Sequence, residues 1–140
     1  MTKTSRKHGG GCLCRQVRYH FSSEPVATVH CHCKDCQKAT GSGFATVFGL
    51  ADNDVDIRGE PALQSFTVTA DSGQTVTRQF CRNCGSPLFT LAENNPGFIW
   101  IKAGSLDDSS WLHPTDCCWA GSATAWAPPD DHLNQHTGNP

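Results

Sequence analysis

The segment Phe80-Cys81-Arg82-Asn83-Cys84-Gly85 decides how this chain folds, because it predicts a metal site. Two cysteines separated by two residues and followed by glycine are typical of a zinc knuckle, in which a tight turn aims both thiolates at one point. Gly85 gives that turn a backbone position with few steric restrictions. A structural zinc ion takes four ligands in a tetrahedron, so the knuckle needs two further ligands from another part of the chain.

Cys12 and Cys14 are the natural second pair, since residues two apart on an extended chain point to the same side. We therefore predict that Cys12, Cys14, Cys81 and Cys84 close one structural Cys₄ site. The alternative for the knuckle is a redox dithiol, but such a motif opens a long helix in a βαβ unit, whereas Pro87 and a strand-like segment follow here. Structural zinc contributes about 10–16 kcal/mol of apparent binding energy, which would compensate for a modest apolar core.

The third cysteine group, Cys31-His32-Cys33-Lys34-Asp35-Cys36, carries three sulfurs within six residues. Cys31 and Cys33 share one face of a strand end, and Cys36 returns from the first turn of a short helix. Three protein ligands and one open position are typical of a catalytic zinc site, which binds a substrate thiol or polarises a carbonyl. Alternatively, a fourth side chain closes the site and makes it purely structural. The candidates for that ligand are His30, His32, Cys117 and Cys118.

The composition excludes several classes of protein. The chain has 140 residues, of which 37% are apolar and 17% charged, with 13 glycines and 8 prolines. This is the size of one domain, and its apolar runs are too short for a coiled coil or a membrane span. The formal net charge of −2 provides no basic surface, so we expect neither nucleic acid nor a membrane as partner.

The nine cysteines also bear on the compartment. Disulfide-rich domains belong to secreted proteins, whereas this chain begins Met1-Thr2-Lys3-Thr4-Ser5 without the apolar stretch of a signal peptide. In the cytoplasm thiols stay reduced, and clustered cysteines bind metal or carry out chemistry. An odd number of cysteines also suits a full set of disulfides poorly. We therefore expect a cytoplasmic metalloprotein; the alternative is a secreted domain with disulfides.

Short segments in which apolar side chains recur at every second residue dominate the rest of the chain. This period predicts β-strands, and the strand candidates are 17–21, 44–48, 66–69, 76–80 and 98–101. Only Lys34 to Thr40 resembles a helix, which Gly41 ends. The prediction is a mainly β domain of short antiparallel strands with one short helix.

The same survey predicts one domain with two polar ends. We expect a flexible N-terminus over residues 1–8, the folded domain over 9–126, and an extended or disordered tail over 127–140. The tryptophans are expected to pack the second half of the core, or one of them to line a substrate pocket. They are Trp100, Trp111, Trp119 and Trp126.

Four segments then recur in a known order: Gly10-Gly11-Cys12-Leu13-Cys14-Arg15-Gln16-Val17-Arg18-Tyr19, Cys31-His32-Cys33-Lys34-Asp35-Cys36-Gln37-Lys38 with Gly41, Phe80-Cys81-Arg82-Asn83-Cys84-Gly85-Ser86, and Gly104-Ser105-Leu106-Asp107-Asp108. Together they resemble the glutathione-dependent formaldehyde-activating (GFA) family, which also includes centromere protein V. The resemblance covers about residues 9–126, and the three cysteine groups in this order are specific for it.

The resemblance implies a β-tent fold of antiparallel sheets held by a structural zinc ion. The family's reaction joins formaldehyde to glutathione to give S-(hydroxymethyl)glutathione, and in reverse it is a carbon–sulfur lyase reaction. We therefore expect a lyase with two zinc sites, the second of them labile, and a small thiol such as glutathione as substrate. Carried over by residue, the structural zinc falls on Cys12, Cys14, Cys81 and Cys84, and the catalytic zinc falls on Cys31, Cys33 and Cys36.

Two positions depart from the family pattern. Arg15 stands where the family commonly has glycine, and Pro114-Thr115-Asp116 leads into Cys117-Cys118 where the family often has a histidine.

A second hypothesis is a non-catalytic, zinc-stabilised scaffold that binds a protein or small ligand. A glutathione site needs cations for carboxylates, and the candidates beside the cysteine groups are Arg15, Lys34, Lys38 and Arg82.

Overall fold

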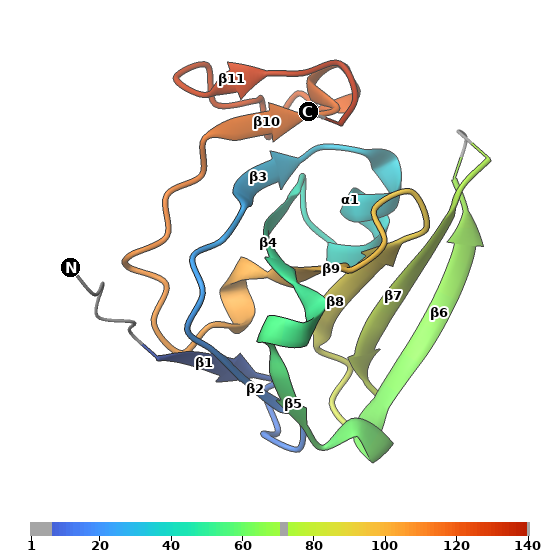
Figure 1. Cartoon of the computed structure of the whole chain (residues 1–140). Helices are drawn as coiled ribbons and strands as arrows, with labels where there is room; N and C mark the ends of the chain where they lie inside the picture. Colours follow the sequence, from blue (N-terminus) through green and yellow to red (C-terminus); the bar gives the residue numbers. More distant parts are fainter. Residues whose placement is uncertain (1–6, 71–72, 140) are drawn as a thin grey trace.

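Two β-sheets make up the computed structural model, which describes residues 7–70 and 73–139 (Figure 1). The small sheet has the strand order β1 (His8–Gly11), β2 (Arg18–Phe21), β5 (Asp56–Arg58). The large sheet has the order β11 (Asn134–Gln135), β10 (Asp116–Cys118), β3 (Ala27–Cys31), β4 (Ala45–Ala51), β9 (Phe98–Lys102), β8 (Pro87–Ala92), β7 (Thr75–Cys81), β6 (Leu63–Thr69). The other elements are helix α1 (Lys34–Thr40) and the 3₁₀ turns η1 (Asp52–Asp54), η2 (Glu60–Ala62), η3 (Ala103–Ser105) and η4 (Ala120–Ser122).

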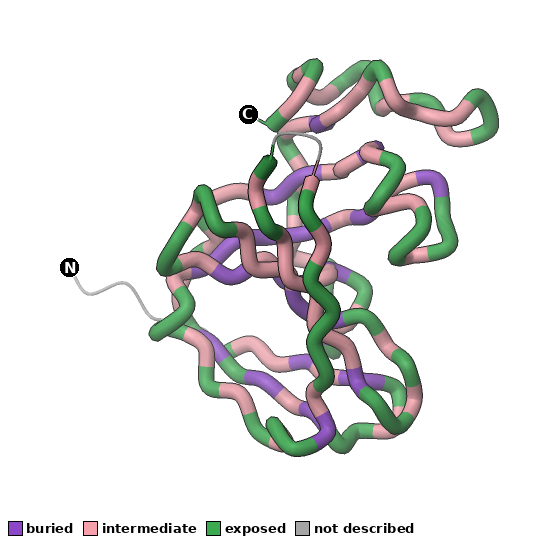
Figure 2. Tube along the Cα trace, turned by 90° about the vertical axis from the view of Figure 1, so that its right-hand side faces the viewer, coloured by how far each residue is buried: buried purple, intermediate pink, exposed green. Residues whose placement is uncertain are grey.

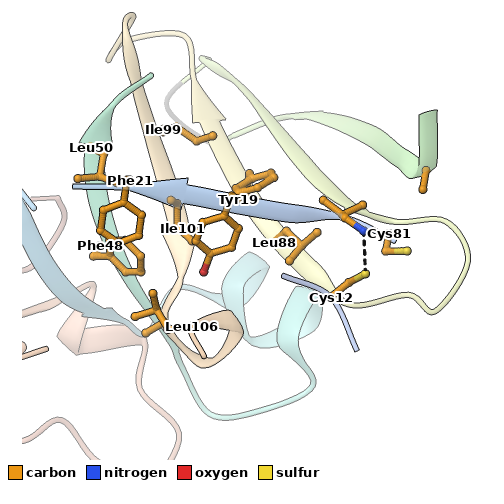
Figure 3. Packing of buried hydrophobic residues seen from close by; sticks show 14 residues of the cluster. Cys12, Tyr19, Phe21, Phe48, Leu50, Cys81, Leu88, Ile99, Ile101 and Leu106 are labelled. Atoms are coloured by element: carbon orange, nitrogen blue, oxygen red, sulfur yellow. Dashed lines mark hydrogen bonds between the residues drawn. The ribbon is translucent and has the colours of Figure 1, made fainter. Parts of the chain in front are cut away.

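The main core lies between the small sheet and one face of the large sheet. Figure 3 shows Tyr19 and Phe21 of β2 packed against Phe48 of β4 and Ile101 of β9. The Tyr19 hydroxyl is 2.7 Å from the hydroxyl of Ser105, so a hydrogen bond also joins the small sheet to η3. The two-residue period of β2, β4 and β9 therefore produces the buried faces that the sequence predicts.

A smaller apolar cluster occupies the opposite face of the large sheet. Val29, Ala45, Val47 and Cys118 are its buried members, and Trp100 and Cys36 pack against them. Gly49 leaves room for the Trp100 ring, because a Cβ atom there would lie 2.8 Å from the indole. This cluster supports the segment that carries the third cysteine group.

Helix α1 spans Lys34–Thr40, the range that the sequence predicts. The Cys33 sulfur accepts a hydrogen bond from the Cys36 amide at 3.2 Å and so caps the helix start. Gly41 ends the helix with φ of 71°, a left-handed conformation that glycine adopts readily. The Gln37 side chain donates to the His32 carbonyl at 2.8 Å, which ties the helix back to the cysteine loop.

The end of the chain departs from the antiparallel expectation. Strand β10 pairs in parallel with β3 and with β11, although the other strand pairs of both sheets are antiparallel. Parallel pairing arises because the chain crosses over the molecule before and after β10. His136 stabilises the last strand, since its amide donates to the Cys117 carbonyl and its ring contacts the Asp116 carboxylate at 2.7 Å.

Each of the two terminal segments predicted to lie outside the folded domain, residues 1–8 and 127–140, contributes to a strand. Strand β1 begins at His8, whose ring stacks on Trp111 at 4.1 Å, while residues 1–6 lie outside the described part of the chain. Residues 127–139 run along the outer edge of the large sheet, and residue 140 lies outside the description. Figure 2 shows that this segment is mostly exposed or half-buried.

The expectation that all four tryptophans pack the core is wrong for Trp126, which is 72% exposed. Trp111 packs against the main core, and Trp100 and Trp119 pack against the smaller cluster. Trp126 comes after the last 3₁₀ turn, where none of the described residues buries it. Within the described residues, no helix has the length and apolar character needed to cross a membrane.

Candidate metal centres and an adjoining cleft

The predicted structural site is assembled at the end of the main core. The sulfurs of Cys12, Cys14, Cys81 and Cys84 all lie within 4.8 Å of one another. Figure 3 shows Cys12 and Cys81 approaching each other from the segment after β1 and from the end of β7. The fold therefore brings together two pairs that are far apart in the sequence.

The sulfur geometry fits a zinc ion. Tetrahedral zinc with zinc–sulfur bonds of about 2.3 Å separates its sulfurs by about 3.8 Å. The Cys14 sulfur is 3.6 Å from that of Cys12 and 3.7 Å from that of Cys81. Gly85, at φ of 81°, closes the knuckle through a 2.7 Å hydrogen bond from its amide to the Cys81 carbonyl.

Ser86 links the two halves of this site. Its hydroxyl lies 3.2 Å from the Cys84 sulfur and accepts a 3.1 Å hydrogen bond from the Leu13 amide. The hydrogen bond from Ser86 lowers the pKa of Cys84 to about 5. Hydrogen bonding from Asn83 similarly lowers the pKa of Cys14. Since metal ligands must be thiolates, both effects favour metal binding at neutral pH.

The third cysteine group also converges. The sulfurs of Cys31, Cys33 and Cys36 lie within 4.8 Å of one another and are half-buried. Hydrogen bonds from Cys31 and Cys33 lower the pKa of Cys36 to about 3. Hydrogen bonds with Cys33 and then Cys36 raise the pKa of Cys31. The lowered pKa of Cys36 favours its thiolate form, which is the form that binds metal.

None of the four candidates for a fourth ligand joins this group among the described residues. The His30 ring contacts the Thr46 hydroxyl at 2.7 Å. The His32 ring is 1% exposed and lies 5.0 Å from the Phe44 ring, and neither of its nitrogens has a hydrogen-bond partner in the described chain. A tetrahedral metal ion bound by these three sulfurs would have one further position for a ligand.

The two adjacent cysteines of β10 face different surroundings. Cys117 is fully buried, and its sulfur lies 3.7 Å from the Asp130 carbonyl oxygen. Cys118 pairs in register with Cys31, and burial raises the pKa of Cys118 to about 11. Of the two, Cys118 rather than Cys117 therefore lies beside the second cysteine group.

A cleft of about 610 Å³ is lined by Cys12 of the first cysteine group and by neighbours of the second group, although Cys31, Cys33 and Cys36 do not themselves line it. Its wall includes Ala45, which pairs with Cys31, and Thr40, whose hydroxyl donates to the Cys36 carbonyl at 2.8 Å. The volume is in the range of small-molecule sites. Other lining residues are Cys12, Arg15, Arg18, Phe44, Lys102 and Asp107.

Only one of the four predicted cations lines this cleft. Arg15 does so from a left-handed backbone conformation, φ of 71°, which accounts for the glycine that the family commonly has there. Lys34 and Lys38 instead line a smaller groove of about 320 Å³ beside Trp126. Arg82 is exposed and lines neither hollow.

Lys102 is the cation that the sequence patterns did not single out. It ends the buried run Phe98-Ile99-Trp100-Ile101, where a lysine is unusual. Its ammonium donates to the Thr90 hydroxyl at 3.0 Å, and burial lowers the pKa of Lys102. It also lines the cleft. A charged residue at the end of a buried strand was the available signal.

Two clusters of thiols, one of four and one of three, on a mainly β scaffold define a protein able to bind metal at two sites. The sequence profile of the glutathione-dependent formaldehyde-activating enzyme family matches residues 7–122. The chain belongs to this family. Its fold is similar to the crystal structure of a Rhodobacter sphaeroides protein, with a TM-score of 0.57 and 20% identity, over 71% of this chain and 87% of that chain.

Proposed function

We propose that this protein is a zinc-dependent carbon–sulfur lyase that makes or breaks a thiol adduct such as S-(hydroxymethyl)glutathione. The observation that carries the proposal is the group of Cys31, Cys33 and Cys36, which converge without a fourth described ligand beside a cleft. Family membership adds support, because the family is named for glutathione-dependent activation of formaldehyde. The cleft volume of about 610 Å³ is suited to a small organic thiol.

The two cysteine groups have different proposed roles. Cys12, Cys14, Cys81 and Cys84 would hold a structural zinc ion, since four sulfurs within 4.8 Å of one another can supply the four ligands of a tetrahedral site. A second zinc ion, when bound by Cys31, Cys33 and Cys36, supplies Lewis acidity and stabilises a thiolate. These three cysteines are the proposed catalytic residues.

In the synthetic direction, a bond forms between the thiol sulfur and the carbonyl carbon. The carbonyl π electrons move to oxygen, which takes up the proton released by the thiol, so the adduct retains every atom of both reactants. The reverse reaction breaks the same carbon–sulfur bond. Thr40 and Ala45 shape the cleft wall beside the cysteine cluster, and Arg15 offers its guanidinium to a substrate carboxylate.

A non-catalytic scaffold is the second candidate function. It is favoured by the position of Cys118, which pairs with Cys31 and is 2% exposed. A rotation of that side chain toward the cluster would close the second site with a fourth thiolate. The two functions therefore differ in whether Cys118 is needed for metal binding.

The test compares Cys33→Ser with Cys118→Ala. We expect Cys33→Ser to stay folded by circular dichroism, to lose one of two zinc ions, and to lose the acceleration of adduct formation from ¹³C-labelled formaldehyde and glutathione in NMR. Cys118→Ala should retain both ions and the activity. Loss of the second zinc in Cys118→Ala, or no acceleration by the unmodified protein, would support the scaffold instead. Full activity in Cys33→Ser would refute the catalytic role of the three-cysteine group. Since the chemistry needs reduced thiols, we place the protein in the cytoplasm.

A further inference from the structure

A half-buried cation shares one sheet face with the second cysteine group. Lys102 of β9 pairs with Val47 of β4, and Val47 pairs with Val29 of β3. Cys31 lies two residues after Val29, and residues two apart on a strand point to the same face. Lys102 and Cys31 therefore project from the same side of the large sheet, two strands apart.

A second cation continues this row across the sheet. Trp100, two residues before Lys102, pairs with Thr90 of β8, and Thr90 pairs with Arg78 of β7. The Lys102 ammonium reaches back to the Thr90 hydroxyl at 3.0 Å. Arg78, Thr90 and Lys102 thus form a polar strip on the face that carries Cys31, opposite the main core.

The two cations lack the usual counter-ions. No carboxylate lies within 4.0 Å of Lys102 or Arg78 among the described residues. Both side chains lie on the sheet face that carries Cys31. A half-buried lysine without a carboxylate partner is unusual, because desolvation disfavours its charge.

The charge of the cysteine group explains why positive charge is needed here. Three thiolates around one divalent cation leave a single net negative charge, and a fourth thiolate raises it to two. Lys102 and Arg78 carry two positive charges on the same face. The charges therefore balance when a substrate thiolate joins the site.

We propose that Lys102, together with Arg78, is a positioning residue that supplies the positive charge needed for a substrate thiolate to join the three-cysteine site. The inference rests on the proposed function and extends it from the ligands to the residues behind them. In this proposal the charge of Lys102 stabilises the thiolate sulfur of the substrate, and other residues bind the carboxylates of the substrate.

The test measures thiol binding to the full chain loaded with Co²⁺, whose visible spectrum responds to thiolate ligands. The variants are Lys102→Met, Lys102→Arg and Arg78→Met. The matched control is Arg58→Met on the small sheet, where Arg58 is exposed and paired with Asp56. Each protein is titrated with glutathione and with 2-mercaptoethanol, which carries no carboxylate, and cobalt affinity is measured by competition with a chelator.

We expect Lys102→Met to weaken binding of both thiols by about tenfold or more, because one nearby charge is removed from a partly desolvated site. Arg78→Met should weaken both thiols less, while Lys102→Arg and Arg58→Met should resemble the unmodified protein. A loss restricted to glutathione would overturn the inference, since Lys102 would then bind a carboxylate. Equal losses in Lys102→Arg and Lys102→Met, or none in Lys102→Met, would overturn it as well.

The same titration separates this inference from the proposed function. If the unmodified, cobalt-loaded protein binds neither thiol, the proposed lyase function fails and the role of Lys102 fails with it. If the unmodified protein binds both thiols and all variants bind equally well, only the role of Lys102 is refuted. Should Lys102→Met fail to fold, Arg78→Met and Lys102→Arg still test whether charge or shape matters.

Discussion

Single side chains around the cysteines decide which sulfurs carry charge. Ser86 hydrogen-bonds to Cys84 and lowers its pKa to about 5. In the second group, hydrogen bonds from Cys31 and Cys33 lower the pKa of Cys36. In each cluster one lowered pKa favours a thiolate, the form that a metal ion binds.

At Cys84 we predict that serine prevents stable folding. Cys84→Ser removes one of four ligands from a closed site whose zinc contributes on the order of 10 kcal/mol of apparent binding energy. The variant should aggregate on expression or show a strongly lowered melting temperature. Cys33→Ser is the matched control, since it lies in the three-ligand group. A folded Cys84→Ser protein with its full zinc content would contradict the structural role of this site.

The chain's single tyrosine gives a pH prediction. Burial raises the pKa of Tyr19 from 10.0 to about 12. A phenol is neutral when protonated, and burial favours the neutral form. The contribution of Tyr19 to the free energy of unfolding is therefore fully present below pH 10 and is lost as the pH rises from 10 through about 12. The difference corresponds to about 3 kcal/mol of unfolding free energy at high pH.

The phenolate absorbance at 295 nm reports Tyr19 alone, because no other tyrosine is present. We expect the folded protein to ionise near pH 12 and the protein in denaturant near pH 10. Tyr19→Phe should lose this absorbance change and the hydrogen bond to Ser105. A folded-state midpoint near 10 would show that Tyr19 is open to water, contrary to its burial.

At the scale of elements, turns hold the two sheets in place. Gly59 joins β5 to η2 with φ of 85°, and a Cβ atom there would lie 1.8 Å from the Gln16 carbonyl oxygen. Gln16 belongs to the loop that follows the first cysteine pair. The turn at Gly59 therefore packs directly on the loop that follows Cys12 and Cys14.

Alanine substitution separates backbone strain from this close contact. Gly97 has nearly the same φ, 84°, with no neighbouring atom within 4 Å of its would-be Cβ. Gly97→Ala should cost about 1–2 kcal/mol from the left-handed backbone alone. Gly59→Ala should cost about 2–4 kcal/mol because a clash is added. Chemical denaturation measures both, and equal costs would contradict the contact with Gln16.

The strands illustrate which elements the sequence can predict. Alternating apolar residues identified β2, β4, β7 and β9, and the stop at Gly41 identified the end of α1, because these signals are local. The parallel pairing of β10 with β3 could not be predicted, since it depends on where a distant segment crosses the molecule. For the same reason, the sequence did not show that Cys118 rather than Cys117 lies beside Cys31.

For the molecule as a whole, the four-cysteine group joins the two sheets. Cys12 and Cys14 come from the loop between β1 and β2 of the small sheet, while Cys81 and Cys84 come from the end of β7 in the large sheet (Figure 1). A metal ion there would hold one end of the main core closed. The second group lies near helix α1, on the opposite face of the large sheet, so we expect loss of a metal ion bound there to leave the main core intact.

The candidate site was predictable as far as cysteine spacing reaches. The spacing identified both cysteine groups, because ligands two or three residues apart converge locally. It could not identify Lys102 or Arg78, since strands β7 to β9 bring these residues to one face only in the folded sheet. Arg15 was predicted as a cleft cation from its place beside Cys14, and it lines the cleft. Lys34 and Lys38 were predicted in the same way from their place beside the second cysteine group, but they line another groove.

The most direct test of an open thiol-binding zinc site is the zinc content per chain, measured on the purified protein and again after titration with glutathione. The account predicts two zinc ions, one of which glutathione perturbs or releases while the other stays bound. Two zinc ions that are both indifferent to glutathione, or only one zinc ion in the fully reduced protein, would contradict it.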